Sequence, residues 1–479
     1  MQRSRVHRVG GLLLGLSLIV AACGDDDDDD TGDTASVETE APDATSADTG
    51  GPDTTAGTET TEGGADTTTA ATGEPGEPGA LEGMKGTTPM PPELSQEFRD
   101  RLATTPSGAN LTDYNYAAES YDAVMLIALA AEAAGTDGSA LAAEIVNVSR
   151  EGEACSTFAE CVELVRAGTD INYEGVSGPN DLNGNGEPLS GTYGVLQFGP
   201  DNRIDESLTR NVSAQAPESA IVDITPVGVE REGDGVLKIG SLLPQTGDLA
   251  FLGPPEFAGV ELAIAEINEA GGVLGNPVEY AAGDSGDDKS DTANRTVDRL
   301  INQENVDAII GAAATGVTLN VIDTITQAGV IQFSPANTGV ALTEKEDNGL
   351  YFRNAPPDSL QGPVIADLVL EDGAETAYIL ARDDAYGNGL ADVIETVLND
   401  SGVEVLNKVI YDPAAPSFDS EVNDIKAADP DAIVLIGFNE SSKILRTMVE
   451  QGIGPRNKLV YGSDGNMGNA LGEDFDAGR

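Results

Sequence analysis

From residue 237 onward, short apolar runs alternate with longer amphipathic stretches. Six of these runs have the length of a strand: residues 237–243, 308–311, 330–333, 377–380, 432–437 and 458–461. Between the first two, residues 254–270 repeat apolar positions at helical spacing, begin with two prolines and end before two glycines, which predicts a helix. Continuous apolar strands that alternate with helices indicate parallel sheets covered on both faces. The sequence therefore predicts an α/β protein.

The part of the chain before residue 206 has a different pattern. Long helical periodicity predicts one helix near residues 115–134 and a second from 139 to about 148, and strand and turn signals follow from 172 to 198. Residues 206–235 hold two prolines and no clear period, so we expect a connector there. After residue 79 we therefore divide the chain into segments 80–205, 206–235, 236–354 and 355–479.

Within residues 309–343, two strands of the buried type each run into a short turn of small and hydroxyl-bearing residues. The first turn contains Thr315, and the second contains Ala336 and Thr338. We expect each turn to open a helix, whose first backbone N–H groups are unpaired and carry a partial positive charge. Two such turns side by side would hold the carboxylate of an amino acid or a similar small acid. This pattern predicts capture of a ligand and not catalysis.

Residues 1–23 have the features of an export signal, with three arginines before an apolar run that is too short for a permanent membrane span. The ending Val-Ala-Ala-Cys23 resembles a bacterial lipobox, which implies an extracytoplasmic protein anchored to the membrane by lipid on Cys23. An ordinary signal peptide with a chance cysteine is the alternative. Residues 24–79 contain many Asp, Thr and Gly residues and no Lys or Arg, so we expect a disordered, extended linker.

The composition narrows the possible functions. The net charge of −58 argues against nucleic acid or an anionic membrane surface as a partner. The one histidine, His7, lies in the export signal, so the exported chain cannot form a Ser-His-Asp or Cys-His nucleophile and lacks the commonest metal ligand. An amidase or esterase would also need a Gly-x-Ser-x-Gly turn, which is missing. We expect no enzymatic activity, no catalytic residue, no cofactor and no metal site.

Two further features could suggest a metal, and we interpret both otherwise. Cys155 and Cys161 could in principle bind one, but outside the cytoplasm a close pair without histidine or a second cysteine pair predicts a disulfide. Residues 181–186 fit the first half of a calcium loop. The twelfth position is Thr192 where that loop requires glutamate, and no helices flank it, so we expect a β-turn.

Several motifs carry a family resemblance. They are LKIGSLLPQTGDLA (237–250), INEAGGVLG (267–275), IIGAAATG (309–316), FSPANTG (333–339), DDAYGNGLA (383–391), DAIVLIGFNE (431–440) and YGSDGNMGN (461–469). Together they resemble the solute-binding proteins of branched-chain amino acid ABC transporters, which have the type I periplasmic binding protein fold. The resemblance implies two lobes, each a parallel sheet flanked by helices, with a hinged cleft between them. Residues 236–354 with 97–168 would form lobe 1, and 355–479 with 80–90 and the strand near 192–198 would form lobe 2.

The resemblance also implies a function and a partner. A small amino acid-like ligand would bind in the cleft and pass to an ABC permease. A sensor of the same fold that reports to a signalling partner is one alternative, and a binder of a small amide or urea-type solute is another.

The order of the motifs departs from the family pattern. Residues 117–135 and 172–188 resemble the final third of such a protein, yet here they precede its usual beginning. The two parts complement each other without a duplicated element. We therefore interpret the chain as a circular permutation in which residues 206–234 join the usual C-terminus to the usual N-terminus. A broken tandem pair and a wrongly assembled gene are the alternatives.

The family pattern also assigns roles to individual residues. Thr315 would bind the ligand carboxylate by its side chain and its N–H, and Thr338 would offer its N–H to the carboxylate and its hydroxyl oxygen to the ammonium. The carbonyl of Ala336 would accept from the ammonium as well. Asp464 stands where relatives place a longer glutamate against the ammonium, which leaves the fit to an unmodified amino acid open.

Aromatic residues would cover the ligand. Tyr386 matches an aromatic that covers it from lobe 2, and Phe438 is expected to be the opposing aromatic. Leu252 stands about where other members have an aromatic pocket wall, so the preferred ligand side chain stays open.

Overall fold

The structure, a computed structural model, describes residues 79–91 and 94–475, which all belong to one compact unit. The predicted export signal, Cys23 and the linker up to residue 78 lie outside the described residues. Within the described part, no single helix is long and apolar enough to cross a membrane. One bent pair, Ala117–Ala134 with Ser139–Ser149, meets that test by length and composition only when the two helices are taken together.

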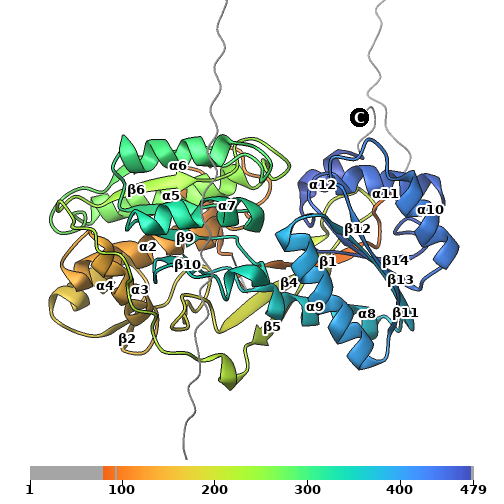
Figure 1. The fold of residues 1–479 in the computed structure, drawn as a ribbon, viewed down its shortest axis with the longest axis horizontal. Coiled ribbons are helices and arrows are strands. Elements are labelled where there is room, and N and C mark those ends of the chain that lie inside the picture. Colours follow the sequence, from red (N-terminus) through yellow and green to blue (C-terminus); the bar gives the residue numbers. More distant parts are fainter. Residues whose placement is uncertain (1–78, 92–93, 476–479) are drawn as a thin grey trace, which may run out of the picture. The chain divides into compact units, whose positions relative to one another are not determined.

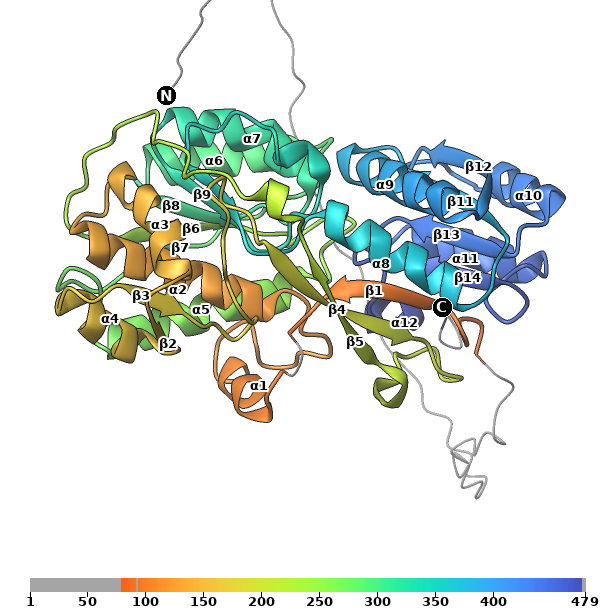
Figure 2. The same cartoon turned by 90° about the horizontal axis from the view of Figure 1, so that it is seen from below.

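The larger of the two main sheets combines strands from both ends of the chain. Its seven strands have the order β12-β11-β13-β14-β1-β4-β5. They span Glu404–Tyr411 (β12), Thr376–Arg382 (β11), Ala432–Ile436 (β13), Leu459–Gly462 (β14), Lys85–Pro89 (β1), Ser190–Gln197 (β4) and Arg210–Gln215 (β5). The strands from β12 to β1 are parallel, and β4 and β5 each run antiparallel to the strand before. Figure 2 shows β1, β4 and β5 extending this sheet beyond β14.

The second main sheet has five parallel strands in the order β10-β9-β8-β6-β7. They span Tyr351–Arg353 (β10), Ile331–Ser334 (β9), Ala308–Gly311 (β8), Lys238–Leu242 (β6) and Glu279–Ala281 (β7). A separate parallel pair joins β2 (Glu153–Cys155) to β3 (Ile171–Tyr173). The parallel sheets confirm the predicted α/β class.

Helices cover both faces of each main sheet (Figures 1 and 2). Successive residues of a strand point to opposite faces of the sheet, so an uninterrupted apolar strand contributes side chains to the hydrophobic core on each face. In β8, Ile310 packs in the core with α2 (Ala117–Ala134) and α5 (Gly253–Glu269), whereas Ile309 packs with α6 (Thr292–Asn302) and α7 (Thr315–Gln327).

The larger sheet follows the same rule. Val434 of β13 packs in the core with α8 (Asp358–Glu371) and α9 (Ala385–Ser401). Its neighbour Ile433 packs with α10 (Asp419–Ala428), α11 (Ser441–Glu450) and α12 (Asn469–Glu473). The remaining helices are α1 (Gln96–Leu102), α3 (Ala142–Ser149) and α4 (Phe158–Arg166).

Two local features differ from what the sequence pattern predicts. Helix α2 begins at Ala117 and not near residue 115, because Tyr116 has a left-handed backbone with φ 61° that cannot continue a helix. The expected connector 206–235 contains β5, which pairs with β4 along its whole length. The β-turn predicted in residues 181–186 is confirmed: the Gly186 N–H donates to the Asn183 carbonyl at 2.9 Å, the Asn183 N–H donates to the Glu187 carbonyl at 2.6 Å, and Leu182 bridges Pro188.

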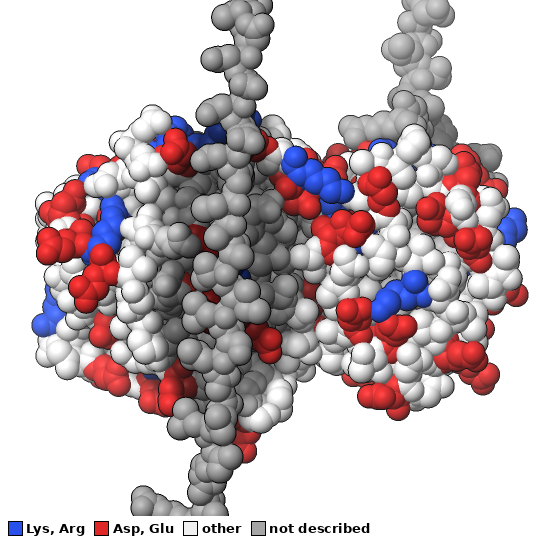
Figure 3. Space-filling model, in the orientation of Figure 1, with Lys and Arg blue, Asp and Glu red and all other residues white. Residues whose placement is uncertain are grey.

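The surface is acidic, as the composition indicates. On the face drawn in Figure 3, Asp and Glu side chains are spread over the described residues, and Lys and Arg are fewer. Several of the basic residues lie beside an acid, such as Lys408 with Asp392 at 2.6 Å.

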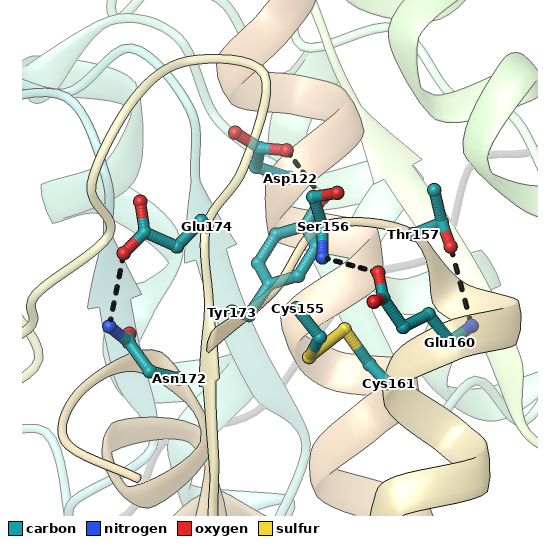
Figure 4. Close-up of a disulfide and its surroundings, with 9 residues drawn as sticks. All are labelled: Asp122, Cys155, Ser156, Thr157, Glu160, Cys161, Asn172, Tyr173 and Glu174. Atoms are coloured by element: carbon teal, nitrogen blue, oxygen red, sulfur yellow. Dashed lines mark hydrogen bonds between the residues drawn. A yellow bond between two sulfur atoms is a disulfide. The ribbon is translucent and has the colours of Figure 1, made fainter. Parts of the chain in front are cut away.

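The predicted disulfide is confirmed (Figure 4). Cys155 at the end of β2 and Cys161 in α4 are bonded, with Cα atoms 5.4 Å apart. Helix α4 begins at an N-cap, where the Thr157 hydroxyl accepts from the Glu160 N–H, and the Glu160 carboxylate accepts from the Ser156 N–H, both at 3.3 Å. The disulfide therefore joins β2 to the first turn and a half of a well-capped helix.

Candidate functional site

One small cavity collects residues that follow strands of both main sheets. It is lined by Tyr116, Leu249, Leu252, Ala313, Ala314, Thr315, Ala336, Thr338, Tyr386, Phe438, Asp464 and Gly465. All six residues for which the sequence predicted ligand contacts line this cavity, and so does Leu252. Their contacts with a ligand stay a prediction.

Thr315 is placed by the turn between β8 and α7. Helix α7 begins at Thr315, and the preceding Ala314 provides no side-chain cap, so the first N–H groups of the helix stay available. The Thr315 hydroxyl accepts from the Gly339 N–H at 3.2 Å. A side chain at position 339 would collide with Thr315, because a Cβ there would lie 2.4 Å from its methyl group. Gly339 therefore allows the two turns to approach closely.

The second turn differs from the prediction, because it opens a single 3-10 turn, Val340–Leu342, and not an α-helix. Several of its backbone groups already form hydrogen bonds. The Ser334 hydroxyl accepts from the N–H groups of Ala336 at 3.3 Å and Asn337 at 2.9 Å. The Thr338 carbonyl accepts from the Asp358 N–H at 2.7 Å. Among the described residues, none accepts a hydrogen bond from the Thr338 N–H.

Side chains fix the two turns to each other. The Asn337 side-chain amide donates to the Ala313 carbonyl at 2.7 Å and its oxygen accepts from the Tyr351 hydroxyl at 3.0 Å. Arg353, which is fully buried at the end of β10, donates to the carbonyls of Asn337 at 3.3 Å and Gly339 at 2.9 Å. The free N–H groups of Thr315 and Thr338 are thus held in a rigid frame.

Asp464 follows β14 and is 6% exposed. Each of its oxygens accepts one hydrogen bond from a tyrosine hydroxyl, Oδ2 from Tyr116 at 2.9 Å and Oδ1 from Tyr386 at 2.7 Å. Burial and the nearby Asp464 raise the pKa of both tyrosines well above the usual range, so both are neutral donors. Each carboxylate oxygen can accept a second hydrogen bond. Asp464 can therefore also meet a cationic donor in the cavity.

The sequence pattern gives no indication of a role for Tyr116 in the site. It comes from the loop before α2, far from Asp464 along the chain, and its left-handed backbone turns its ring toward the cavity end of β14. Helical periodicity places this residue inside the predicted helix, where no special role is visible. A local signal is absent, because the positive φ of a tyrosine cannot be seen in the sequence.

The predicted position of Phe438 needs correction. Phe438 does not oppose Tyr386 but stacks on it, with ring centroids 5.4 Å apart and planes at 22°. The two residues follow β13 and β11, which are neighbours in the sheet, so their side chains lie side by side. The Arg382 guanidinium lies 3.5 Å from the centre of the Phe438 ring and forms ion pairs with Asp384 and Glu440.

The described residues contain no group of three or more His, Cys, Asp or Glu side chains that could hold a metal ion. The cavity combines free N–H groups at one wall with a buried carboxylate at another. This arrangement can bind a small molecule that carries both an acidic and a basic group.

Comparison with known proteins agrees with this architecture. Residues 236–478 match the family model described as periplasmic binding protein. The chain belongs to this family. Residues 54–201 match a second model, described as the ligand binding region of a receptor family.

Two curated relatives are 28% and 34% identical to the chain over the aligned residues. Leu/Ile/Val-binding protein homolog 3 of Brucella melitensis is 28% identical over 252 residues, 52% of this chain and 66% of the relative. The chemotactic signal transduction system substrate-binding protein BasB of Halobacterium salinarum is 34% identical over 212 residues, 43% of this chain and 50% of the relative. The chain spans about half to two thirds of the length of these curated relatives.

One solved structure matches about half of this chain. The branched-chain amino acid transporter substrate binding protein LivJ from Streptococcus pneumoniae, in complex with isoleucine, is 31% identical and has a TM-score of 0.45. The match covers 50% of this chain and 68% of that chain.

Proposed function

We propose that this protein is an extracytoplasmic, lipid-anchored solute-binding protein that captures a small amino acid-like ligand and delivers it to an ABC importer. One observation carries the proposal: the free N–H groups of Thr315 and Thr338 and the carboxylate of Asp464 line the same small cavity. A zwitterion in a buried site needs a donor for its carboxylate and an acceptor for its ammonium, because either group is costly to bury unpaired.

The carboxylate end would lie against the two turns. The first N–H of α7, with its partial positive charge, and the N–H of Thr338 would donate to the two carboxylate oxygens. The ammonium end would lie against Asp464, with the Ala336 carbonyl and the Thr338 hydroxyl as further acceptors. Tyr386 with Phe438 on one side and Leu252 on another would enclose the ligand side chain.

A melting-temperature screen tests the ligand class. We expect neutral and branched-chain amino acids to raise the melting temperature, because a ligand at about 100 times its dissociation constant stabilises the native state by about 2.7 kcal/mol. The panel should include small amides and urea, which stand for the alternative ligand class. If no amino acid and no amide shifts melting, the proposed ligand class is wrong.

Asp464→Asn tests the geometry, since asparagine keeps the shape and removes the charge. We expect the variant to bind the amino acid at least 30-fold more weakly, because losing one partner of a buried charged pair costs about 2–5 kcal/mol. Asp424→Asn is the matched control, since Asp424 is exposed on α10. Equal affinity of the Asp464 variant and the control would refute the ammonium role.

A sensing receptor is the second candidate function. The name of the BasB relative refers to chemotactic signal transduction, and ligand capture would be the same in both cases. Neighbouring genes would separate the two, because permease and ATPase genes favour transport. For the anchor, we expect Cys23→Ser to release the protein from the membrane fraction into the soluble extracytoplasmic fraction.

We also propose that the chain is circularly permuted. In support, the periplasmic binding protein match begins at residue 236, and β1 from the N-terminal part pairs in parallel with β14, with Lys85 opposite Tyr461. A gene that places residues 80–205 after residue 479 should give a protein that folds and binds the same ligand. A rearranged chain that stays unfolded would contradict the permutation and favour a broken tandem pair.

A further inference from the structure

A second carboxyl group lies beside the cavity, and the proposed function does not use it. Asp358 is the first residue of α8 and is fully buried. Its backbone N–H donates to the carbonyl of Thr338, which lines the cavity. Neither carboxyl oxygen of Asp358 has a hydrogen-bond partner among the described residues. This is unusual, since buried polar side chains nearly always have partners.

The neighbours of Asp358 do not compensate a negative charge. Its strongest electrostatic neighbour is Asp464, and Asp384 repels it as well. The nearby Thr338 hydroxyl and the positive charge of Arg353 lower the pKa of Asp358. Arg353, however, already forms a buried ion pair with Glu187.

Neutral groups complete the surroundings. The Tyr193 hydroxyl from β4 and the Gln361 side-chain oxygen from α8 are buried without partners among the described residues. Tyr386 from α9 is sensitive to the charge of both Asp358 and Asp464. Asp358 and Asp464 therefore form a pair of buried acids, with Tyr193, Tyr386 and Gln361 as uncharged neighbours.

Two buried carboxyl groups in this position cannot both be ionised without a cation. A buried carboxylate that lacks hydrogen bonds is destabilised by several kcal/mol, and a second negative charge beside it adds to that cost. Consistent with this, burial and Asp464 raise the pKa of Asp358 well above its ordinary value, and burial also raises the pKa of Asp464. Burial without partners and the charge of Asp464 thus both favour the protonated form of Asp358.

We propose that Asp358 determines ligand specificity: it holds a proton while the cavity is empty and loses that proton when a ligand places a cationic nitrogen beside Asp464. The inference rests on the proposed function and assigns the preferred ligands to primary amines in their ammonium form. The O–H bond of the Asp358 carboxyl breaks, its proton goes to the solvent buffer, and the arriving ammonium supplies the positive charge that replaces it. No bond other than hydrogen bonds forms.

A ligand without a cationic nitrogen cannot make this exchange. A hydroxyl or an amide brings no charge, so the proton stays on the pair and Asp464 gains no ionic partner. Asp358 thereby separates an amino acid from the hydroxy acid of the same carbon skeleton. It acts behind Asp464 and is a positioning residue, because it does not line the cavity.

Calorimetry measures the exchange directly. L-Leucine is titrated into the full chain at pH 7 in phosphate and in Tris, whose ionisation enthalpies differ, and the difference in heat gives the protons released. We expect about one proton per leucine bound to the wild type, and at least a tenfold preference for leucine over 2-hydroxy-4-methylpentanoate. For Asp358→Asn we expect almost no proton release. Equal wild-type heats in the two buffers, or unchanged release in the variant, would overturn the inference.

Glu256→Gln is the matched control. Glu256 is fully buried with both oxygens unpartnered among the described residues, as Asp358 is, but it faces Glu119 and does not line the cavity. Its removal should leave the proton release on leucine binding unchanged. A loss of release equal to that of Asp358→Asn would assign the effect to general loss of a buried acid and overturn the specific role. The wild-type measurement stands even if one variant fails to fold.

Capillary electrophoresis without ligand separates this inference from the proposed function. If Asp358 carries the proton at pH 7, Asp358→Asn leaves the net charge and the mobility unchanged, whereas Asp424→Asn shifts mobility by one charge. Equal shifts in both variants would overturn the inference alone. If leucine and every other amine fail to bind, the amine preference and the proposed function are both overturned.

Discussion

Arg353→Met should reveal how much of the site depends on one buried side chain. Arg353 is fully buried and joins four groups: the carbonyls of Asn337 and Gly339, the Thr343 hydroxyl at 3.0 Å, and the Glu187 carboxylate in an ion pair. The first two carbonyls flank Thr338, so Arg353 fixes the turn that presents the Thr338 N–H. Methionine has a similar length and removes every donor.

The expected loss of stability follows from these partners. Removing one member of a buried ion pair costs about 3–5 kcal/mol, because the other charge is left uncompensated. Glu187 would be that residue, and its side chain is 10% exposed. We expect the free energy of unfolding to fall by this amount. Leucine binding should weaken at least tenfold, because the turn around Thr338 loses its support.

Urea unfolding followed by circular dichroism is the suitable assay, since the chain contains no tryptophan. Arg295→Met is the matched control, because Arg295 is 72% exposed and its pair with Asp291 spans 4.0 Å, so it should change stability by less than about 1 kcal/mol. Adding Glu187→Gln to Arg353→Met should restore part of the loss. If Arg353→Met and Arg295→Met unfold at the same urea concentration, Arg353 does not support the site as argued.

Three further changes test other parts of the structure. Replacing Cys155 and Cys161 by alanine should lower the free energy of unfolding by about 2 kcal/mol, the chain-entropy value for so short a loop, and a reducing agent should then have no further effect on melting. Burial raises the pKa of Glu119 from 4.5 to about 8, so its contribution to stability is full below pH 4.5 and falls as pH rises through 8. In Glu119→Gln, the decrease in stability with rising pH, about 1.4 kcal/mol per pH unit for this group, should disappear. The measurement is the urea midpoint of wild type and variant at pH 5 and pH 8. Equal changes in the two midpoints would contradict the prediction. Tyr386→Phe removes a donor to the buried Asp464, so it should lower the free energy of unfolding by about 1–3 kcal/mol and weaken leucine binding, measured by isothermal titration, about tenfold.

The fold class was predictable because its signal is local. Strands such as β8 and β13 are short and apolar throughout, and the helices between them repeat every three to four residues, so period and length identify both. The antiparallel strand β5 was missed because it lies at a sheet edge, where its mostly exposed residues, Arg210–Gln215, show no apolar pattern. Edge strands are defined by backbone pairing, which the side-chain pattern records only weakly.

Site residues that lie in a sequence motif were predictable, whereas those that reach the site only through the three-dimensional fold were not. Thr315, Thr338 and Asp464 each lie within four residues of the end of a strand and in motifs of the family. Tyr116 precedes α2 and Asp358 begins α8 after β10, and neither residue lies in one of these motifs. Asp358 follows two prolines and has the appearance of an ordinary first-turn helix acid, and only the three-dimensional structure shows that it is buried beside Asp464.

The N-terminal part of the chain is integral to both the sheet and the site. β1 lies between β14 and β4, and without it both neighbours would expose unpaired backbone edges in the middle of a sheet. The same part supplies Tyr116, which donates to the acid that follows β14. Residues 236–479 alone would therefore lack a central strand and one of the two hydroxyl groups that hold Asp464. Whatever the history of the chain order, the segment before residue 206 must fold onto the segment after residue 236 before the cavity can exist.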